Sequence, residues 1–198
     1  MNTIILPVIL FTITMTITPG PNNMILTVSG AKFGFKKCLP MIIGIVIGLE
    51  SQLILWSFGL GIIFQKFPFI QTVLKVAGTA YIIYLAIMIA FKSHNNKNNN
   101  SYDKPFSILQ AAGFQYLNPK CYIMTITAMS VFPLDEELYT PSTFLIFSAF
   151  LFITPISVSV WAYFGTILKK LLSKGKNQKF VNYFLGALTA ASAVFIVI

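Results

Sequence analysis

The stretch Thr18-Pro19-Gly20-Pro21-Asn22-Asn23 interrupts an apolar run that is otherwise typical of a membrane-spanning helix. A second interruption, Asn118-Pro119-Lys120, lies in another such run later in the chain. Proline lacks a backbone N–H and clashes with the preceding helical turn. In hydrocarbon, a broken helix is tolerated only where protein groups or a wet cavity satisfy its freed backbone groups. Corresponding breaks in two halves of a membrane protein predict a transporter binding site between them.

The composition indicates an all-α integral membrane protein. Of the 198 residues, 56% are hydrophobic and only 10% are charged, and the mean hydropathy is +0.79. Soluble domains carry about 25% charged residues. The net charge of +9 comes from lysines beside apolar runs, which is the pattern that orients membrane proteins. We therefore expect the lipid bilayer as the surroundings of this chain and no nucleic-acid partner.

Six apolar segments are each close to or longer than the roughly 20 residues that cross a bilayer. They cover residues about 4–30, 39–64, 67–91, 106–132, 142–168 and 180–198. A polar, asparagine-rich linker at 92–104 separates three segments from three. Because three is odd, the second set enters the membrane in the opposite sense. The sequence thus predicts one transmembrane domain over 1–198, a 3+3 inverted repeat with halves at about 1–91 and 105–198, whose first and fourth spans are broken by proline.

The distribution of lysine predicts the orientation of the chain. Most lysines lie in the loops at 31–37, 92–105 and 169–179, whereas the two other loops hold Lys66 alone and the acidic run Asp135-Glu136-Glu137. An excess of lysine marks the cytoplasmic side of a membrane. We therefore expect these three loops inside and both termini outside.

Each break also starts a new half-helix, whose first amides lack partners within the helix. Such a helix start attracts anions. In the predicted orientation the two starts meet near the middle of the membrane, which predicts a carboxylate site. Its candidate residues are Pro19, Gly20, Pro21, Asn22, Asn23, Asn118, Pro119 and Lys120. The alternative is that the prolines only kink the spans for packing.

Two ionisable residues are predicted at the depth of this site. Glu50 is the only acidic residue within any predicted span, and Lys120 directly follows the second break. A charge at the bilayer centre costs at least about 2.5 kcal/mol and commonly marks function or pairing. We expect Glu50 to couple protons and Lys120 to hold the carboxylate. A structural hydrogen bond of Glu50 and a silent ion pair between the two residues are the alternatives.

Other chemistry is sparse in this sequence. Cys38 and Cys121 have no metal-ligand spacing and are expected to pack as small apolar residues. There is no Ser/His/Asp set, zinc spacing or phosphate loop, so we expect no enzyme, no cofactor and no metal site. Gly44 and Gly48 form a small-xxx-small pair, which predicts close approach of another helix.

Five motifs resemble the LysE/RhtB family of amino-acid exporters, and together they span essentially the whole chain. They are the break at 18–23 and the segments 30–37, 44–48, 78–86 and 114–120. Within the family, the branch of cysteine and O-acetylserine exporters is the most similar. Many members carry an acid directly after the second glycine of the span-two pair. In this chain Leu49 holds that position, and the acid is Glu50.

The resemblance implies a secondary active exporter of small amino acids or their derivatives in the bacterial inner membrane, driven by antiport with protons. It places Pro19, Gly20, Pro21, Asn118, Pro119 and Lys120 in the family's core. The substrate ammonium then needs an acceptor, and the side-chain oxygens of Asn22, Asn23, Asn118 and Glu50 are the candidates. A metal or other ion exporter and a non-transporting membrane scaffold are the alternative functions. The particular amino acid, and whether the chain forms a homo-oligomer, are left open.

Overall fold

The structure is a computed structural model that describes residues 1–61, 66–91, 105–172, 183, 186–187 and 189–191. Every regular element in these residues is helical, which confirms the predicted all-α class. The elements are α1 (Asn2–Ile17), α2 (Pro21–Phe33), η1 (Phe35–Cys38), α3 (Leu39–Ser57), α5 (Pro68–Phe91), α6 (Ile108–Leu117), α7 (Pro119–Val131), η2 (Glu136–Leu138) and α8 (Tyr139–Leu172). The predicted linker at 92–104 and most of the predicted sixth span at 180–198 lie outside the described residues.

Two helical segments of the described chain are long and apolar enough to cross a membrane, Phe35–Ser57 and Tyr139–Leu168. A third span results if α1 and α2 are taken together, with a bend of 55° at the break between them. The six-span repeat therefore stays a prediction. The predicted second span, 39–64, ends earlier than expected, because α3 stops at Ser57 and Gly59 takes a positive φ of 81°, a conformation that commonly ends helices.

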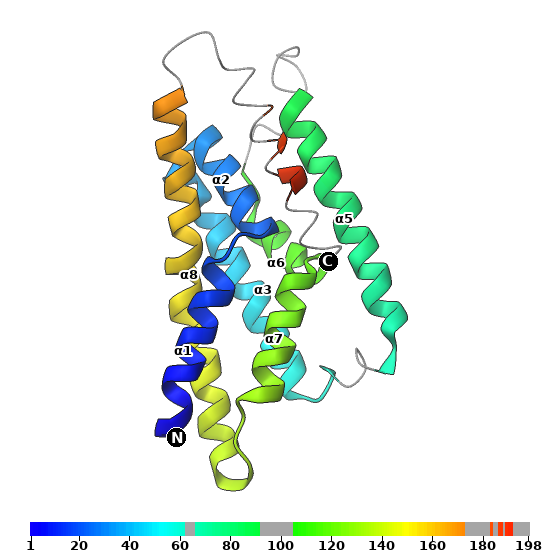
Figure 1. Cartoon of the computed structure of the whole chain (residues 1–198), viewed down its shortest axis with the longest axis vertical. Coiled ribbons are helices and arrows are strands. Elements are labelled where there is room, and N and C mark those ends of the chain that lie inside the picture. Colours follow the sequence, from blue (N-terminus) through cyan, green and yellow to red (C-terminus); the bar gives the residue numbers. More distant parts are fainter. Residues whose placement is uncertain (62–65, 92–104, 173–182, 184–185, 188, 192–198) are drawn as a thin grey trace.

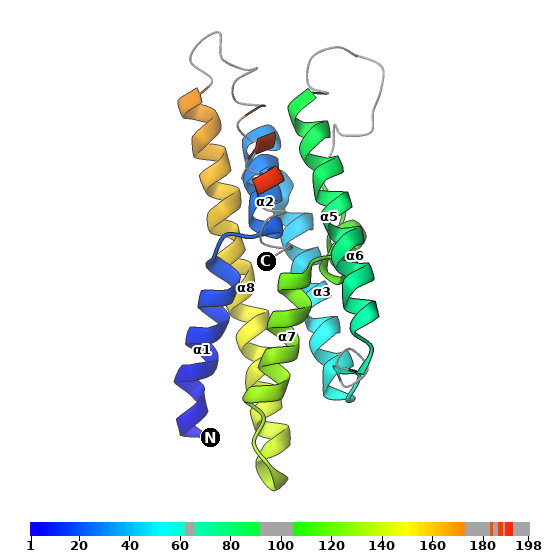
Figure 2. The same cartoon turned by 45° about the vertical axis from the view of Figure 1, so that its right-hand side comes forward.

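The long axis of the bundle is shared by most helices (Figures 1 and 2). The C-terminal ends of α2, α5 and α8 lie at one end, whereas the N-terminus and η2 lie at the other. The helix ends that lead into the three lysine-rich loops therefore share one end of the molecule. Both proline breaks lie between these ends, and α2 and α7 run from them in opposite directions.

The contact between α2 and α8 is made backbone to backbone. A Cβ atom at Gly30 would overlap the carbonyl oxygen of Ala162, and one at Gly165 would overlap that of Thr27. Small residues at a helix interface are what allows such an approach in membranes. The two glycines thus fix α2 closely along α8.

A second close contact joins α3 to α6. Gly44 lies against the carbonyl oxygen of Ile108, and Gly48 lies against Ala112 and the side chain of Gln115. This confirms the prediction that the small-xxx-small pair brings another helix near. Its consequence is that α3 lies directly beside the second proline break.

The apolar side chains divide into an inner and an outer set. The inner set is fully buried and includes Leu26, Met41, Ile45, Leu53 and Phe150. The outer set stays exposed on the helix surfaces and includes Leu6, Leu10, Ile43, Ile47 and Ile156. An apolar surface of this kind suits a bundle that is surrounded by lipid.

Candidate functional site

The two proline breaks adjoin each other in the middle of the bundle. Proline takes the first helical position of both α2 and α7, at Pro21 and Pro119, where its missing N–H costs least. Gly20 precedes α2 in an extended conformation, and a Cβ atom there would lie 3.0 Å from Cδ of Lys120. The residues predicted from the two halves of the chain therefore do lie together.

At the first break, a tryptophan replaces the donor that proline removes. In an unbroken helix, residue 21 would donate to the carbonyl of Ile17, but Pro21 has no N–H. The indole Nε1 of Trp161, on α8, donates to this carbonyl at 2.9 Å. The helix that packs closest to α2 thus also satisfies the broken end of α1.

The remaining carbonyls at the end of α1 accept from Asn23 and Lys120. Asn23 Nδ2 donates to the carbonyls of Thr16 and Thr18, at 3.0 and 2.8 Å. Lys120 Nζ lies 2.8 Å from the Thr18 carbonyl, 2.7 Å from Thr18 Oγ1 and 3.3 Å from the carbonyl of Pro19. An ammonium has three N–H donors, so these three contacts occupy all of them.

At the second break, a glutamine supplies the missing donor. Pro119 cannot donate to the carbonyl of Gln115. Nε2 of Gln52, on α3, donates to this carbonyl at 2.9 Å, and the N–H of Asn118 also reaches it, at 3.3 Å. The Gln52 side chain is held in turn by Thr125, whose hydroxyl lies 3.0 Å from Gln52 Oε1 and accepts from Trp56 Nε1 at 2.8 Å. Each proline's lost hydrogen bond is thus replaced by a side chain of a neighbouring helix.

A pair of buried amides links the two breaks directly. Asn22 Nδ2 donates to Gln115 Oε1 at 2.7 Å, and Gln115 Nε2 donates back to Asn22 Oδ1 at 3.2 Å. The Cys121 thiol donates to the same Gln115 oxygen at 3.1 Å. Cys38 and Cys121 are both buried, as predicted, but Cys121 is also part of this polar network, which its sequence context did not indicate.

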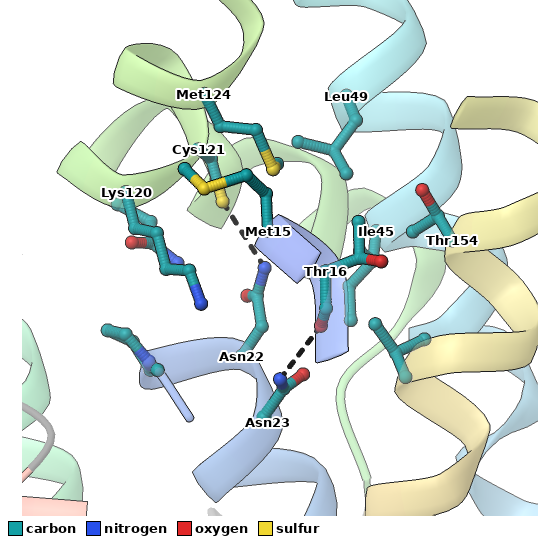
Figure 3. A pocket seen from close by; sticks show the side chains of 14 residues that line it. Met15, Thr16, Asn22, Asn23, Ile45, Leu49, Lys120, Cys121, Met124 and Thr154 are labelled. Carbon is teal, nitrogen blue, oxygen red and sulfur yellow. Dashed lines mark hydrogen bonds between the residues drawn. The ribbon is translucent and has the colours of Figure 1, made fainter. Parts of the chain in front are cut away.

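A small cavity of about 20 Å³ lies between the breaks. Six of the predicted site residues line it: Gly20, Pro21, Asn22, Asn23, Asn118 and Lys120. Pro19 and Pro119 do not line it, whereas Thr154 and Val158 of α8 add a wall that the sequence did not predict. Figure 3 shows Lys120, Cys121 and Met124 on one side of Asn22, with Ile45, Leu49 and Thr154 on the other. The space holds about one water molecule, so in this conformation it is too small for an amino acid.

Two of the residues that line this cavity carry a buried polar atom without a partner. Asn118 Oδ1 and Thr154 Oγ1 are both buried, and neither has a hydrogen-bond partner among the described residues. Buried polar groups are paired in most proteins. Within the described residues, these two atoms lack that usual pairing.

Glu50 lies outside this set of residues. Its neighbour Leu49 lines the cavity, at the position where many family members carry an acid, and Glu50 does not. Glu50 Oε1 is buried without a hydrogen-bond partner in the described part of the chain. Lys120 bonds to Thr18 and Pro19, so the alternative of a Glu50–Lys120 ion pair is wrong for this conformation.

The sequence of this chain is similar to a known protein family. The family described as LysE type translocator matches residues 13–198. The cysteine/O-acetylserine efflux proteins of Escherichia coli (strain K12) and Shigella flexneri serotype 5b (strain 8401) are each 31% identical over 129 residues. The match spans 64% of this chain and 64% of each relative's own length. No solved structure matches the chain. Since the family match extends over nearly all of the sequence, this chain belongs to the LysE type translocator family.

Proposed function

We propose that this chain is a secondary active exporter of small amino acids or their derivatives. The observation that carries the proposal is the single cavity between two proline breaks from different halves of the chain, lined by Gly20, Asn22, Asn118 and Lys120. Broken helices of this kind hold substrate in other transporters. The relatives' name, cysteine/O-acetylserine efflux protein, supports a small polar amino acid as the cargo.

The proposed architecture is six spans in a 3+3 inverted repeat within one domain, with halves at about 1–91 and 105–198. The chain lies in the bacterial inner membrane with both termini outside. The shared position of the C-terminal ends of α2, α5 and α8 supports this orientation, because lysine-rich loops follow all three helices. An inverted repeat gives the two faces of the membrane equivalent routes to one central site.

The carboxylate of the substrate is proposed to bind at the starts of α2 and α7, beside Lys120. In the conformation described here, the N–H groups of Lys120 donate hydrogen bonds to Thr18 and to the carbonyl of Pro19. A carboxylate is a stronger acceptor for an ammonium than a neutral carbonyl. Substrate binding would therefore draw Lys120 away from α1, which loosens the first break at the moment the cavity must open.

The proposal is tested with the purified chain in liposomes. The liposomes are loaded with labelled L-cysteine or O-acetyl-L-serine, and a pH gradient is imposed with the acidic side outside. We expect efflux above that of protein-free liposomes, faster with the gradient than without it. Efflux of Mn²⁺ in place of either amino acid would favour the ion exporter, and no flux of any cargo would favour a scaffold.

Proton coupling is proposed to depend on Glu50, whose Oε1 atom is buried without a partner among the described residues. Glu50→Gln keeps the size of the side chain and removes its titration. We expect this variant to exchange labelled for unlabelled amino acid at about the wild-type rate but to gain nothing from a pH gradient. Asp135→Asn, which changes an exposed loop acid, is the matched control. A gradient response equal to wild type in Glu50→Gln would assign the coupling to another group.

A further inference from the structure

The side chain of Asn118 lacks the capping hydrogen bond that an asparagine at the start of a helix usually makes. It is the N-cap residue of α7, where the side-chain oxygen normally accepts from a backbone N–H of the first turn. No such bond forms here, and the N–H of Cys121 instead donates to the backbone carbonyl of Asn118 at 2.9 Å. Asn118 is only 1% exposed and lines the cavity, and its Oδ1 is buried without a partner among the described residues.

Thr154 also lacks a hydrogen bond that buried threonines in helices usually make. A buried threonine in a helix usually donates its hydroxyl to the carbonyl four residues earlier. Three other buried threonines of the described chain do so: Thr12, Thr16 and Thr27. Thr154 is 0% exposed, and its hydroxyl has no partner in the described part of the chain. It lines the same cavity as Asn118.

We propose that Asn118 Oδ1 and Thr154 Oγ1 bind the ammonium group of the exported amino acid. This inference rests on the proposed function and adds Thr154 of α8 to the site. An ammonium is a pure donor with three N–H groups, and an amide oxygen is a pure acceptor. Asn118 Oδ1 therefore needs a donor, and the hydroxyl of Thr154 can accept a second N–H. The cavity of about 20 Å³ matches a group of about the size of one water molecule.

The other candidate acceptors differ from Asn118 in their surroundings. Asn22 Oδ1 accepts from Gln115 Nε2. The side chain of Asn23 is fixed by the two bonds that its Nδ2 donates to the carbonyls of Thr16 and Thr18. Glu50 does not line the cavity. Of the four candidates, Asn118 is the cavity residue whose side-chain oxygen is buried without a hydrogen-bond partner in the described part of the chain.

The charges around the cavity favour a zwitterion as the guest. Lys120 and the starts of α2 and α7 make this region positive, which opposes a bare cation. An amino acid brings its own carboxylate, which Lys120 can bind, so its ammonium can reach the two oxygens without net positive charge being added. The site thus selects molecules that carry both groups.

The experiment compares each amino acid with the acid that lacks only the amine. Efflux of labelled L-cysteine and O-acetyl-L-serine from liposomes is inhibited by the unlabelled amino acid, or by 3-mercaptopropanoate and 3-acetoxypropanoate respectively. We expect wild type to bind each amino acid at least about tenfold more tightly than its amine-free analogue, since a hydrogen bond to a charged group is worth about that factor or more.

Thr154→Val removes the hydroxyl and keeps the branched shape. We expect it to weaken inhibition by the amino acids about tenfold while leaving inhibition by the amine-free acids unchanged, and Thr154→Ser to restore the wild-type values. Thr143→Val is the matched control, because Thr143 is also a buried threonine of α8 without a partner among the described residues but does not line the cavity. Asn118→Ala should show the same selective loss, which keeps the test open if Thr154→Val folds poorly.

Several results would overturn the ammonium site. If Thr154→Val weakened inhibition by the amino acids and by the amine-free acids equally, the role of Thr154 would be merely structural. If it weakened neither, the hydroxyl would not bind the ammonium, and a bound water would be its partner instead. Wild type that does not distinguish amino acids from amine-free acids would reject the site while leaving amino-acid export intact. If wild type moves neither amino acid, the proposed function fails and the ammonium site falls with it.

Discussion

The break between α1 and α2 and the break between α6 and α7 differ in how many side chains bond to the carbonyls that they free. In both, the carbonyl whose helical donor is replaced by proline accepts from a neighbouring helix, through Trp161 at the first break and Gln52 at the second. The asparagines differ. Asn23 donates two hydrogen bonds back to α1, whereas the Asn118 side chain leaves its Oδ1 unpartnered among the described residues.

The difference follows from the number of groups that each break frees. Residues 18–23 contain two prolines and residues 118–120 contain one, so the first break leaves more carbonyls to satisfy in a region without water. Asn23 and Lys120 are used for that purpose. The second break frees fewer carbonyls, and the Asn118 side-chain oxygen makes no bond to the described residues. The first break is therefore the more fully hydrogen-bonded of the two, and the second carries the unpartnered oxygen of the proposed ammonium site.

The largest effect on stability is expected where two donors share one acceptor. Asn23→Leu removes the donor of the buried Thr16 carbonyl, at a cost of about 2 kcal/mol in unfolding free energy. Lys120→Met removes the donor of the exposed Pro19 carbonyl, at a cost of about 1 kcal/mol. The Thr18 carbonyl keeps one donor in either single variant and loses both in the double. We therefore expect the double variant to lose about 1 kcal/mol more than the two single losses together, measured by unfolding in detergent.

Strict additivity in this cycle would mean that the two side chains do not share Thr18 in solution. The first break would then be no more constrained than the second, and the contrast between them would fail. Lys37→Met, a lysine outside both breaks, serves as the control for the loss of a positive charge.

The replacement donors give a smaller and matched pair of effects. Trp161→Phe removes the N–H that reaches Ile17, and Gln52→Leu removes the one that reaches Gln115. An unpaired buried carbonyl costs about 1–3 kcal/mol. We expect a loss of about 1 kcal/mol for Trp161→Phe, because its indole is partly exposed. We expect about 2 kcal/mol for Gln52→Leu, because Gln52 is fully buried and also bonds to Thr125, although the Gln115 carbonyl keeps the N–H of Asn118 at 3.3 Å. Thermal unfolding of the two variants side by side makes the comparison.

A greater loss from Trp161→Phe than from Gln52→Leu would reverse this ranking. It would indicate that the tryptophan supports the first break by more than one hydrogen bond. Trp161→Tyr, which keeps a polar aromatic group but lacks the indole N–H, separates the two contributions.

The smallest effect on stability is expected at Asn118. Replacement of an N-cap asparagine by alanine ordinarily costs about 1 kcal/mol, but the Asn118 side chain makes no capping bond here. We expect Asn118→Ala to change the unfolding free energy by less than about 0.5 kcal/mol, whereas amino-acid efflux falls strongly. A stability loss of the ordinary size would show that Asn118 caps α7 after all, and the two breaks would then be alike.

The sequence predicted the helix ends at the breaks closely, because proline has a strong preference for the first helical position. Pro21 and Pro119 begin α2 and α7, and six of the eight predicted residues line the cavity. Periodicity and composition alone also predicted the all-helical class. These features depend on local chemistry, which a single sequence contains.

What the sequence could not predict depends on which distant side chains face each other. Trp161, Gln52 and Thr154 lie in apolar spans far from either break in the chain, and only packing brings them to the site. Gln115 lies just before the second break, but its pairing with Asn22 of the first break also depends on packing. The amide side chains of Gln52 and Gln115 were the available signal, because amides inside apolar spans need partners. The bonds of Lys120 to α1 were likewise missed, since its reach to Thr18 depends on how two helices cross.

The glycine contacts of α2 with α8 and of α3 with α6 have a consequence for how the bundle can move. Helices whose backbones approach this closely leave little to repack between them, so each pair is expected to move as one rigid body. Residues of both bodies line the cavity, with Asn22 and Thr154 on one and Ile45 and Leu49 on the other. If the cavity takes an amino acid, as proposed, the two bodies must move apart, and the hydrogen bond from Asn22 of α2 to Gln115 of α6 is one that this motion must break.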